Sequence, residues 1–192
     1  MIRLGQRPPA RILLCLLWAA GIIVGLYKIT AYSSTAGEAF PQPRQWPEET
    51  TLSRAADRPT MLLTLHPRCA CSRATLEELA RLLAQIPKPL RVLVLLYHPD
   101  AELGSWTETD LVIQARSIPG VVVQPDPKGV ESERLGMSVS GHTAVYTADG
   151  RLLFNGGITR ARGHAGDNAG PSAIVSLLSN QQPVATRTPV FG

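Results

Sequence analysis

Hydrophobic and polar positions fall into blocks along this chain, and the first block predicts an apolar N-terminal helix. Residues 12–27 form a run of 16 positions without a charge, almost all of them apolar. About 20 residues cross a bilayer as a helix, and the flanking Arg11 and Lys28 can extend the run because their long stems reach the interface. We therefore expect a transmembrane anchor within residues 1–32, preceded by a short N-terminal stub.

Charges beside the apolar run predict its orientation. Three arginines precede it and only Lys28 follows closely, so the positive-inside rule keeps the N-terminus in the cytoplasm. A cleaved signal peptide is the alternative interpretation, with residues 34–36 as a small-residue cleavage site. Both interpretations export the remaining chain. We expect a single-pass protein of the inner cell membrane that meets lipid through residues 12–32 and carries a periplasmic domain.

The next blocks predict a linker and then alternating strands and helices. Residues 33–57 are rich in Pro, Glu and Thr without periodicity, which is typical of a linker. Apolar runs at 61–65 and 90–97 predict strands, the second apolar enough to be buried on both faces. Residues 72–85 show the apolar stripe of a helix, with Ser72 as a plausible N-cap.

The second half of the chain continues the alternation and ends in a hairpin. The turn Ala148-Asp149-Gly150 predicts that hairpin because glycine tolerates the positive φ of a tight turn. We place the domain at 58–180, with an α/β sheet, and expect a flexible tail over 181–192. The predicted elements are a helix capped by Thr107 and running to Ile118, a strand over 121–123, a helix over 128–135, strands over 143–147 and 151–155, and a helix over 171–178.

The composition of the chain argues against several classes of protein. The net charge is +4 with no dense run of Lys or Arg, and the chain has only three Phe and four Tyr, so we expect no nucleic-acid partner. Three cysteines exclude a disulfide-rich scaffold. Cys15 lies inside the apolar run, where we expect a lipid-facing or packing residue.

The other two cysteines suggest thiol chemistry. Cys69 and Cys71 lie where the first predicted strand meets the first predicted helix of the domain. A helix N-terminus stabilises a thiolate and so lowers the pKa of a cysteine. An oxidising compartment outside the membrane lets a disulfide form and persist. These positions predict a redox or metal-binding function.

Two segments resemble the thioredoxin-like superfamily, and within it the membrane-tethered, exported TlpA-type proteins. They are residues 63–79, which contain the Cys-x-Cys-Ser run, and residues 142–151, His-Thr-Ala-Val-Tyr-Thr-Ala-Asp-Gly-Arg. Residues 155–158 and 162–168 are also similar to RedB-type proteins. The resemblance implies a thioredoxin-like fold, with a central mixed sheet flanked by helices after the transmembrane helix.

The resemblance also implies roles for individual residues. Cys69 falls on the family's attacking cysteine and Ser72 on its resolving cysteine, while Cys71 occupies a position between them. His142 stands in place of the cis-proline that usually faces the dithiol. In that fold the late strand runs antiparallel to the first, so we expect His142 to lie at the same end of the sheet as Cys69. The basic loop with Arg160, Arg162 and His164 would join them there.

The preferred hypothesis is thiol-disulfide exchange with exported protein thiols or disulfides as partners. Cys69 attacks and Cys71 resolves, with Ser72 and His142 completing the site and no cofactor. A disulfide that spans one intervening residue is constrained, which makes the pair easily reduced. Alternatively, Cys69 works alone, as in Cys-x-x-Ser proteins.

Several further interpretations stay open at this point. Two thiolates and an imidazole, from Cys69, Cys71 and His142, suit Cu(I), so a copper chaperone is the second hypothesis. A non-catalytic exported binding module is the third. His142 can also simply fill the space left by the absent proline. The glycine-rich residues 156–170 either begin the last helix or bind an anion.

Overall fold

The computed structural model describes residues 10–38, 40–99, 104–183 and 185–192. The chain divides into two compact units, one within residues 1–34 and the other within residues 35–192. Residues 1–9, which belong to the predicted N-terminal stub, lie outside the described residues. Each unit is described by itself below.

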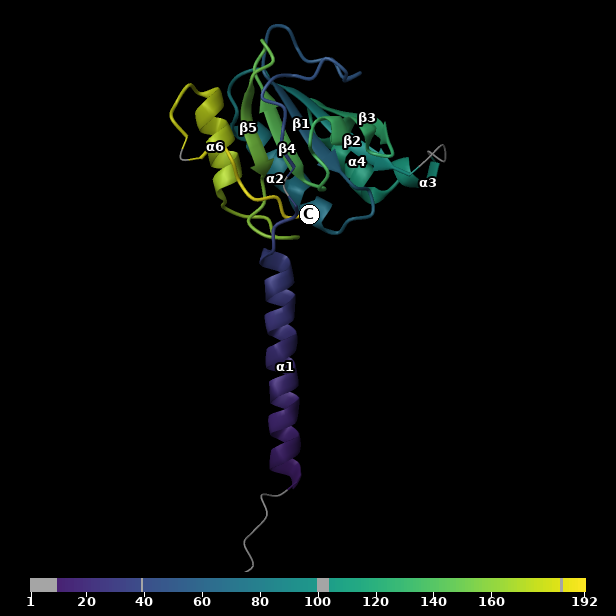
Figure 1. Cartoon of the computed structure of the whole chain (residues 1–192), viewed down its shortest axis with the longest axis vertical. Coiled ribbons are helices and arrows are strands. Elements are labelled where there is room, and N and C mark those ends of the chain that lie inside the picture. Colours follow the sequence, from purple (N-terminus) through teal and green to yellow (C-terminus); the bar gives the residue numbers. More distant parts are fainter. Residues whose placement is uncertain (1–9, 39, 100–103, 184) are drawn as a thin grey trace, which may run out of the picture. The chain divides into compact units, whose positions relative to one another are not determined.

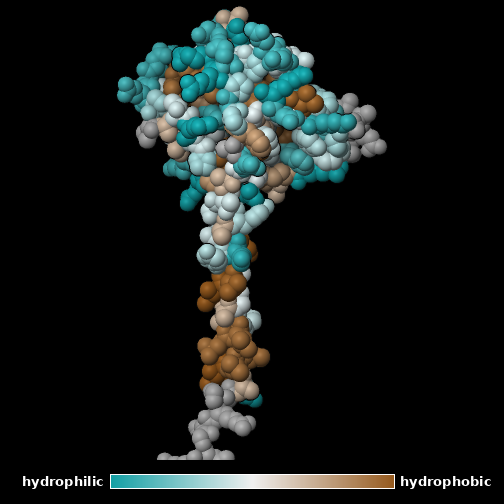
Figure 2. All heavy atoms as spheres, viewed as in Figure 1, coloured by the Kyte–Doolittle hydropathy of each residue, from teal (hydrophilic) through white to brown (hydrophobic). Residues whose placement is uncertain are grey.

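The first unit is one apolar helix, α1 (Ala10–Ser34). It has 25 residues, none of them buried, and it is long and apolar enough to cross a membrane. A helix of that length rises about 37 Å, which exceeds the hydrocarbon thickness of a bilayer. Figure 2 shows the apolar surface along this helix. The predicted apolar helix is confirmed, while its orientation and its membrane stay predictions.

The second unit is built on a five-stranded mixed sheet in the order β3-β2-β1-β4-β5 (Figure 1). The central strand β1 pairs in parallel with β2, and β2 pairs in parallel with β3. On its other side β1 pairs antiparallel with β4, which pairs antiparallel with β5. The predicted α/β sheet with a terminal hairpin is confirmed. Its strands are β1 (Thr60–Leu65), β2 (Arg91–His98), β3 (Val121–Pro127), β4 (His142–Tyr146) and β5 (Leu152–Gly157).

Helices α2 (Cys71–Gln85), α4 (Asp110–Ser117) and α6 (Ala169–Leu178) cover one face of this sheet. Alternate strand residues point to opposite faces, so every second residue of β1 and β2 joins the core beneath these helices. The core also contains Leu76, Leu79 and Leu82 of α2 and Ile174 of α6. Two short helices complete the unit, α3 (Gly104–Thr107) and α5 (Val130–Arg134).

The opposite face of the sheet is covered by the segment that we predicted as a linker. Leu52 is 4% exposed and packs there with Leu62 of β1. The rings of Trp46 and Tyr146 meet edge to face, with centroids 5.2 Å apart. The backbone N–H of Trp46 donates to the carbonyl oxygen of Gly150 at 2.7 Å. This corrects the linker prediction: proline-rich composition hid a segment that buries apolar side chains as part of the fold.

The end of the chain also differs from the predicted flexible tail. The N–H of Asn155 in β5 donates to the carbonyl oxygen of Thr186 at 3.1 Å, and Thr188 N–H donates to the carbonyl oxygen of Asn155 at 3.2 Å. Val190 is buried, and its carbonyl oxygen accepts from Gly37 N–H at 2.8 Å. The tail thus bonds to the edge of β5, where unpaired backbone groups need partners. The tail prediction is corrected accordingly.

Gly156 permits this close approach. Its φ is 151°, a region that L side chains rarely adopt, and a Cβ atom there would lie 2.6 Å from the backbone nitrogen of Thr188. Any larger residue would separate the tail from β5.

The remaining local differences concern the length of β3 and the helix termini. Strand β3 continues to Pro127, beyond the predicted 121–123, because it pairs with β2 as far as His98. Helix α2 begins at Cys71 after Ala70, which makes no side-chain cap hydrogen bond. The prediction of Ser72 as N-cap is therefore wrong, and its hydroxyl bonds elsewhere. Helix α4 is capped by Thr109 rather than Thr107, because the Thr109 side chain accepts from Val112 N–H. Asn168 caps α6 by accepting from the N–H of Gly170 at 3.1 Å.

Candidate functional site

Cys69 and Cys71 form a disulfide at the junction of β1 and α2. Their Cα atoms are 5.3 Å apart, within the usual range for bridged cysteines. Cys69 is partly exposed, whereas Cys71 is 5% exposed as the first residue of the helix. Cys69 is therefore the more exposed residue of the pair, and Cys71 is buried.

A tight turn after β1 places the disulfide at the start of the helix. The N–H of Cys69 donates to the carbonyl oxygen of His66 at 3.1 Å, and the N–H of Ser72 donates to the carbonyl oxygen of Cys69 at 3.1 Å. Pro67 is buried inside the turn, where its fixed φ suits the change of direction. The partial positive charge of the helix N-terminus then lies beside both sulfur-bearing residues.

Ser72 links this turn to the segment before β4. Its hydroxyl donates to the carbonyl oxygen of His66 at 3.1 Å, and its Oγ lies 3.0 Å from Ser140 Oγ. Ser140 Oγ also accepts from the N–H of His66 at 3.0 Å. The neighbouring Gly141 N–H donates to the carbonyl oxygen of Thr64 at 2.7 Å. Residues 139–141 therefore flank the cysteine turn, as expected for the strand that faces it.

Ser140 is the site residue that sequence reasoning did not select. We predicted the segment around it, but chose His142 because that residue stands in the proline position. A serine in a Ser-Gly pair before a strand is a frequent turn residue. Nothing in the sequence marks its hydroxyl as the partner of Ser72.

An aromatic cluster borders the exposed side of the turn. The His66 ring stacks on Tyr97 with centroids 5.3 Å apart and meets Trp106 edge to face at 5.7 Å. The guanidinium carbon of Arg68 lies 3.9 Å from the centroid of the Trp106 ring. This cation–π contact holds a positive charge one residue before Cys69.

His66 is neutral near pH 7 within this cluster. Its Nδ1 accepts the N–H of Arg68 at 3.3 Å, which leaves the ring proton on Nε2. Burial lowers the pKa of His66, and the charge of Arg68 lowers it further. The ring supplies an uncharged polar surface beside the disulfide.

His142 does not face the disulfide, contrary to our expectation. It starts β4 on the side of the sheet that Ala144 and Tyr146 share, opposite α2. Its Nε2 donates to Asn155 Oδ1 at 2.6 Å, and the side-chain amide nitrogen of Gln42 lies 2.9 Å from the same ring atom. The backbone of β4 starts at the end of the sheet where we expected it, the end at which Cys69 lies. Because side chains alternate along a strand, the imidazole of His142 nevertheless lies on the sheet face opposite α2.

The basic loop is bonded to α2 through Glu78. The N–H of Gly166 donates to Glu78 Oε1 at 2.7 Å, and His164 Nδ1 lies 2.8 Å from the carbonyl oxygen of Arg162. Arg160 is exposed. Residues 156–170 were expected either to begin the last helix or to bind an anion. The structure supports the first interpretation, because Asn168 caps α6 at the end of this segment.

The predicted copper ligands are not assembled. Among residues 10–38, 40–99, 104–183 and 185–192, no group of three His, Cys, Asp or Glu side chains could hold a metal ion. Both cysteines are in the disulfide, and His142 bonds to Asn155 on the opposite face.

Strand order, strand direction and the position of the disulfide decide the fold family. Parallel β1 and β2 are joined through α2, an antiparallel hairpin of β4 and β5 follows, and α6 closes the unit. The disulfide lies at the N-terminus of the helix that follows the central strand. The fold is thioredoxin-like. The resemblance seen in the sequence is thus confirmed for the fold, whereas the TlpA-type and RedB-type assignments stay predictions.

Comparisons with known proteins find solved structures of similar fold. No protein-family model and no curated protein matches the chain. A hypothetical protein of Sinorhizobium meliloti 1021 is similar in structure with a TM-score of 0.55 at 16% identity, over 82% of this chain and 92% of that one. An uncharacterized conserved protein of Geobacillus kaustophilus gives 0.55 at 15%, over 82% and 89%. A thioredoxin-like protein in the oxidized form gives 0.46 at 13%, over 75% and 98%.

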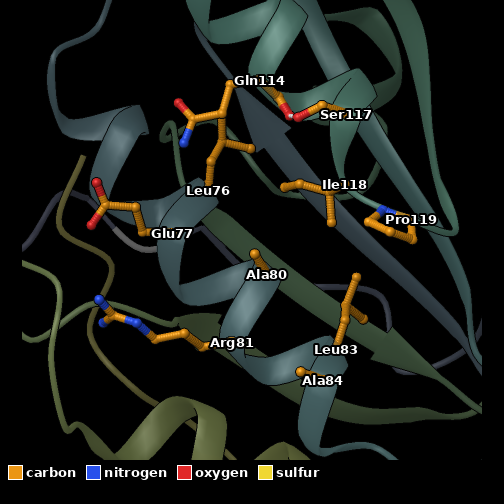
Figure 3. Close-up of a pocket in the computed structure, with 10 residues that line it drawn as sticks. All are labelled: Leu76, Glu77, Ala80, Arg81, Leu83, Ala84, Gln114, Ser117, Ile118 and Pro119. Carbon is orange, nitrogen blue, oxygen red and sulfur yellow. Dashed lines mark hydrogen bonds between the residues drawn. The ribbon is translucent and has the colours of Figure 1, made fainter.

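One cavity of the thioredoxin-like domain lies beside α2, and no cysteine lines it. It is open to solvent on one side, has a volume of about 590 Å³, and is lined by residues of α2, of α4 and of the segment after α4 (Figure 3). Apolar side chains line much of it, among them Leu76, Leu83 and Ile118. It separates the middle of α2 from α4 and does not reach the disulfide.

Proposed function

We propose that this thioredoxin-like domain carries out thiol-disulfide exchange at the Cys69–Cys71 disulfide. The observation that supports it most strongly is the unequal exposure of the two cysteines. Cys69 is partly exposed at the turn, and Cys71 is 5% exposed at the first position of α2. This is the arrangement that exchange requires, because a partner must reach one sulfur while the other closes the cycle.

The reaction starts from the oxidised site. A partner thiolate attacks Cys69 Sγ, a new S–S bond forms, and the Cys69–Cys71 bond breaks with Cys71 leaving as a thiolate. A second partner thiolate then attacks the partner sulfur of this mixed disulfide and releases Cys69 as a thiolate. The partner dithiol is oxidised to a disulfide by two electrons, the cysteine pair is reduced, and two protons from the partner thiols pass to solvent or to the cysteines. The reverse sequence oxidises the pair.

The start of α2 favours the charged intermediates of this sequence. Ala70 provides no side-chain cap, so the positive end of the helix is directed at the cysteines rather than neutralised by a capping oxygen. Stabilising the Cys71 thiolate makes it a better leaving group and keeps the reduced form reactive. Ser72 does not supply a thiol, and its bonds to His66 and Ser140 keep the turn in place.

The short spacing favours an oxidising role. A ring closed across a single residue is constrained by its size alone, which raises the reduction potential relative to a Cys-x-x-Cys pair. We expect a potential above the value of about −270 mV that is typical of thioredoxin. With the chain anchored by α1, the partners would be exported proteins with thiols or disulfides at the outer face of the membrane.

Variants of the full-length protein in detergent micelles test this function. The reduced protein is mixed with oxidised glutathione, and exchange is followed by the release of glutathione thiol and, in wild type, by formation of the Cys69–Cys71 bond. Cys69→Ser should abolish exchange, and Cys71→Ser should accumulate a mixed disulfide. Cys15→Ser is the matched control, because Cys15 is a free cysteine in α1. Equal exchange in Cys69→Ser and Cys15→Ser would contradict the proposal.

A further inference from the structure

A second cavity lies in the domain at the start of β4, on the sheet face opposite α2. Its volume is about 710 Å³, within the range of ligand pockets in proteins. The segment before the first strand forms one wall and the C-terminal tail forms the other. The lining residues are Ala36, Gly37, Phe40, Pro41, His142, Asn155, Arg187, Thr188, Pro189 and Val190.

The polar part of this cavity comes from three adjacent segments: β4, β5 and the C-terminal tail. Arg187 pairs in parallel with Asn155 of β5, and paired residues direct their side chains to the same face. Asn155 in turn accepts from His142 Nε2 at 2.6 Å. Arg187, Asn155 and His142 are therefore adjacent along one side of the cavity.

The electrostatics of this side suit an anion. Arg187 is the charged member of the lining, which contains no Asp or Glu. Its guanidinium is exposed and presents a planar fork of N–H donors that matches an oxyanion. Three effects act on the pKa of His142. Burial lowers this pKa most, the hydrogen bond to Asn155 raises it, and the charge of Arg187 lowers it.

His142 carries an unused polar atom at this place. The residue is 3% exposed, and its Nδ1 is buried without a hydrogen-bond partner among the described residues. A buried polar atom without a partner costs free energy that a ligand can recover. A neutral ring accepts at Nδ1 and a protonated ring donates there, so a bound anion would favour the protonated form.

Apart from Thr188, whose hydroxyl donates to the carbonyl oxygen of Gly157 at 2.8 Å, the rest of the lining is apolar. Phe40 and Pro41 come from the N-terminal segment, and Pro189 and Val190 come from the tail. A fully hydrated inorganic ion makes no use of such walls, whereas an organic body gains by burying its surface against them.

We propose that this cavity binds a small amphipathic carboxylate. Arg187 pairs with the carboxylate, Asn155 and His142 orient it, and Phe40, Pro41 and Val190 contact its apolar body. This site lies on the opposite side of the sheet from the disulfide, so the proposal does not depend on thiol-disulfide exchange.

Histidine NMR of the full-length protein in lipid nanodiscs tests this site. The chain has four histidines, and His142→Gln assigns the ring signals of His142 in protein labelled with 15N-histidine. Benzoate is the probe, because it joins a carboxylate to an apolar ring. We expect saturable shifts of the His142 signals with benzoate and none with the neutral analogue benzamide. Arg187→Gln should weaken benzoate binding by about tenfold or more, because a charge-assisted pair is lost.

The matched control is Arg116→Gln, which removes an exposed arginine from α4 and should leave the affinity unchanged. Equal affinities of wild type and Arg187→Gln for benzoate would overturn the site. The same conclusion would follow if benzamide bound as tightly as benzoate. Inorganic phosphate binding as tightly as benzoate would overturn the assignment of an amphipathic ligand.

Discussion

The hydroxyl oxygens of Ser72 and Ser140 lie 3.0 Å apart, and this contact ties the first turn of α2 to the segment before β4. Both hydroxyls also bond to the backbone of His66, through its carbonyl oxygen and its N–H. The turn that carries the disulfide is thus fixed from two directions. Ser72 stabilises this turn through its hydrogen bonds. It occupies the position where the thioredoxin-like resemblance places a resolving cysteine.

Replacing the two serines should reveal their coupling. Ser72→Ala removes one of the two donors to the His66 carbonyl oxygen, and Ser140→Ala removes the acceptor of the His66 N–H. Each should lower the free energy of unfolding by about 1 kcal/mol. The double variant should lose less than the sum, with a coupling of about 0.5–1.5 kcal/mol, because both changes remove the same bond. Urea unfolding of the three variants measures this. Strict additivity would show that the contact contributes nothing.

A cysteine at position 72 should restore a redox pair when Cys71 is removed. The carbonyl oxygen of Cys69 accepts from Ser72 N–H at 3.1 Å, so the two residues span one turn, as in a Cys-x-x-Cys motif. We expect Cys71→Ser combined with Ser72→Cys to form an intramolecular disulfide and to recover exchange. Mass spectrometry under non-reducing conditions detects the bond. Its absence in a folded double variant would contradict the position assigned to Ser72.

Arg68 should bias the site toward anionic thiols. The Trp106 ring contacts the guanidinium of Arg68, one residue before the partly exposed Cys69. Arg68→Gln should lower the rate with anionic glutathione by about twofold to fivefold relative to cationic cysteamine, the scale of an exposed charge pair. Raising the salt concentration should reduce the difference. Arg116→Gln serves as control, and an identical rate ratio in both variants would exclude a role for Arg68.

Two histidines should make the domain less stable in mild acid. Burial lowers the pKa of both His66 and His142 below the ordinary histidine value of 6.5. Below that pH the unfolded chain binds protons at these positions more readily than the folded chain, so the free energy of unfolding falls as the pH falls. Urea unfolding from pH 7.5 to 5 checks the sign. His142→Gln should reduce this dependence, and stability that rises toward pH 5 would contradict it.

The repeating apolar blocks explain why the fold could be predicted. The runs of β1 and β2 are buried on both faces, and the Asp149-Gly150 turn fixes the hairpin, so local pattern and tertiary structure agree. Residues 33–57 and 181–192 could not be predicted in this way. Their partners are the open sheet face and the edge of β5, which exist only after the sheet has formed.

The candidate site was predictable only in part, for a similar reason. The positions of Cys69 and Cys71 follow from the local strand-to-helix junction. The direction of the His142 side chain depends on the register of β4, where a shift by one residue changes the face. The partner of Ser72 depends on a segment 68 residues away, and no local pattern specifies that contact.

The most direct test of the account is to identify which sulfur of the wild-type disulfide forms the first bond with a partner thiol. The full-length Cys15→Ser protein is mixed with reduced glutathione, quenched in acid within seconds and digested, and fragment spectra of peptide 69–73 locate the adduct. Because Cys69 is partly exposed and Cys71 is buried, the account predicts glutathione on Cys69. Glutathione on Cys71, or a disulfide that stays intact in excess glutathione, would contradict it.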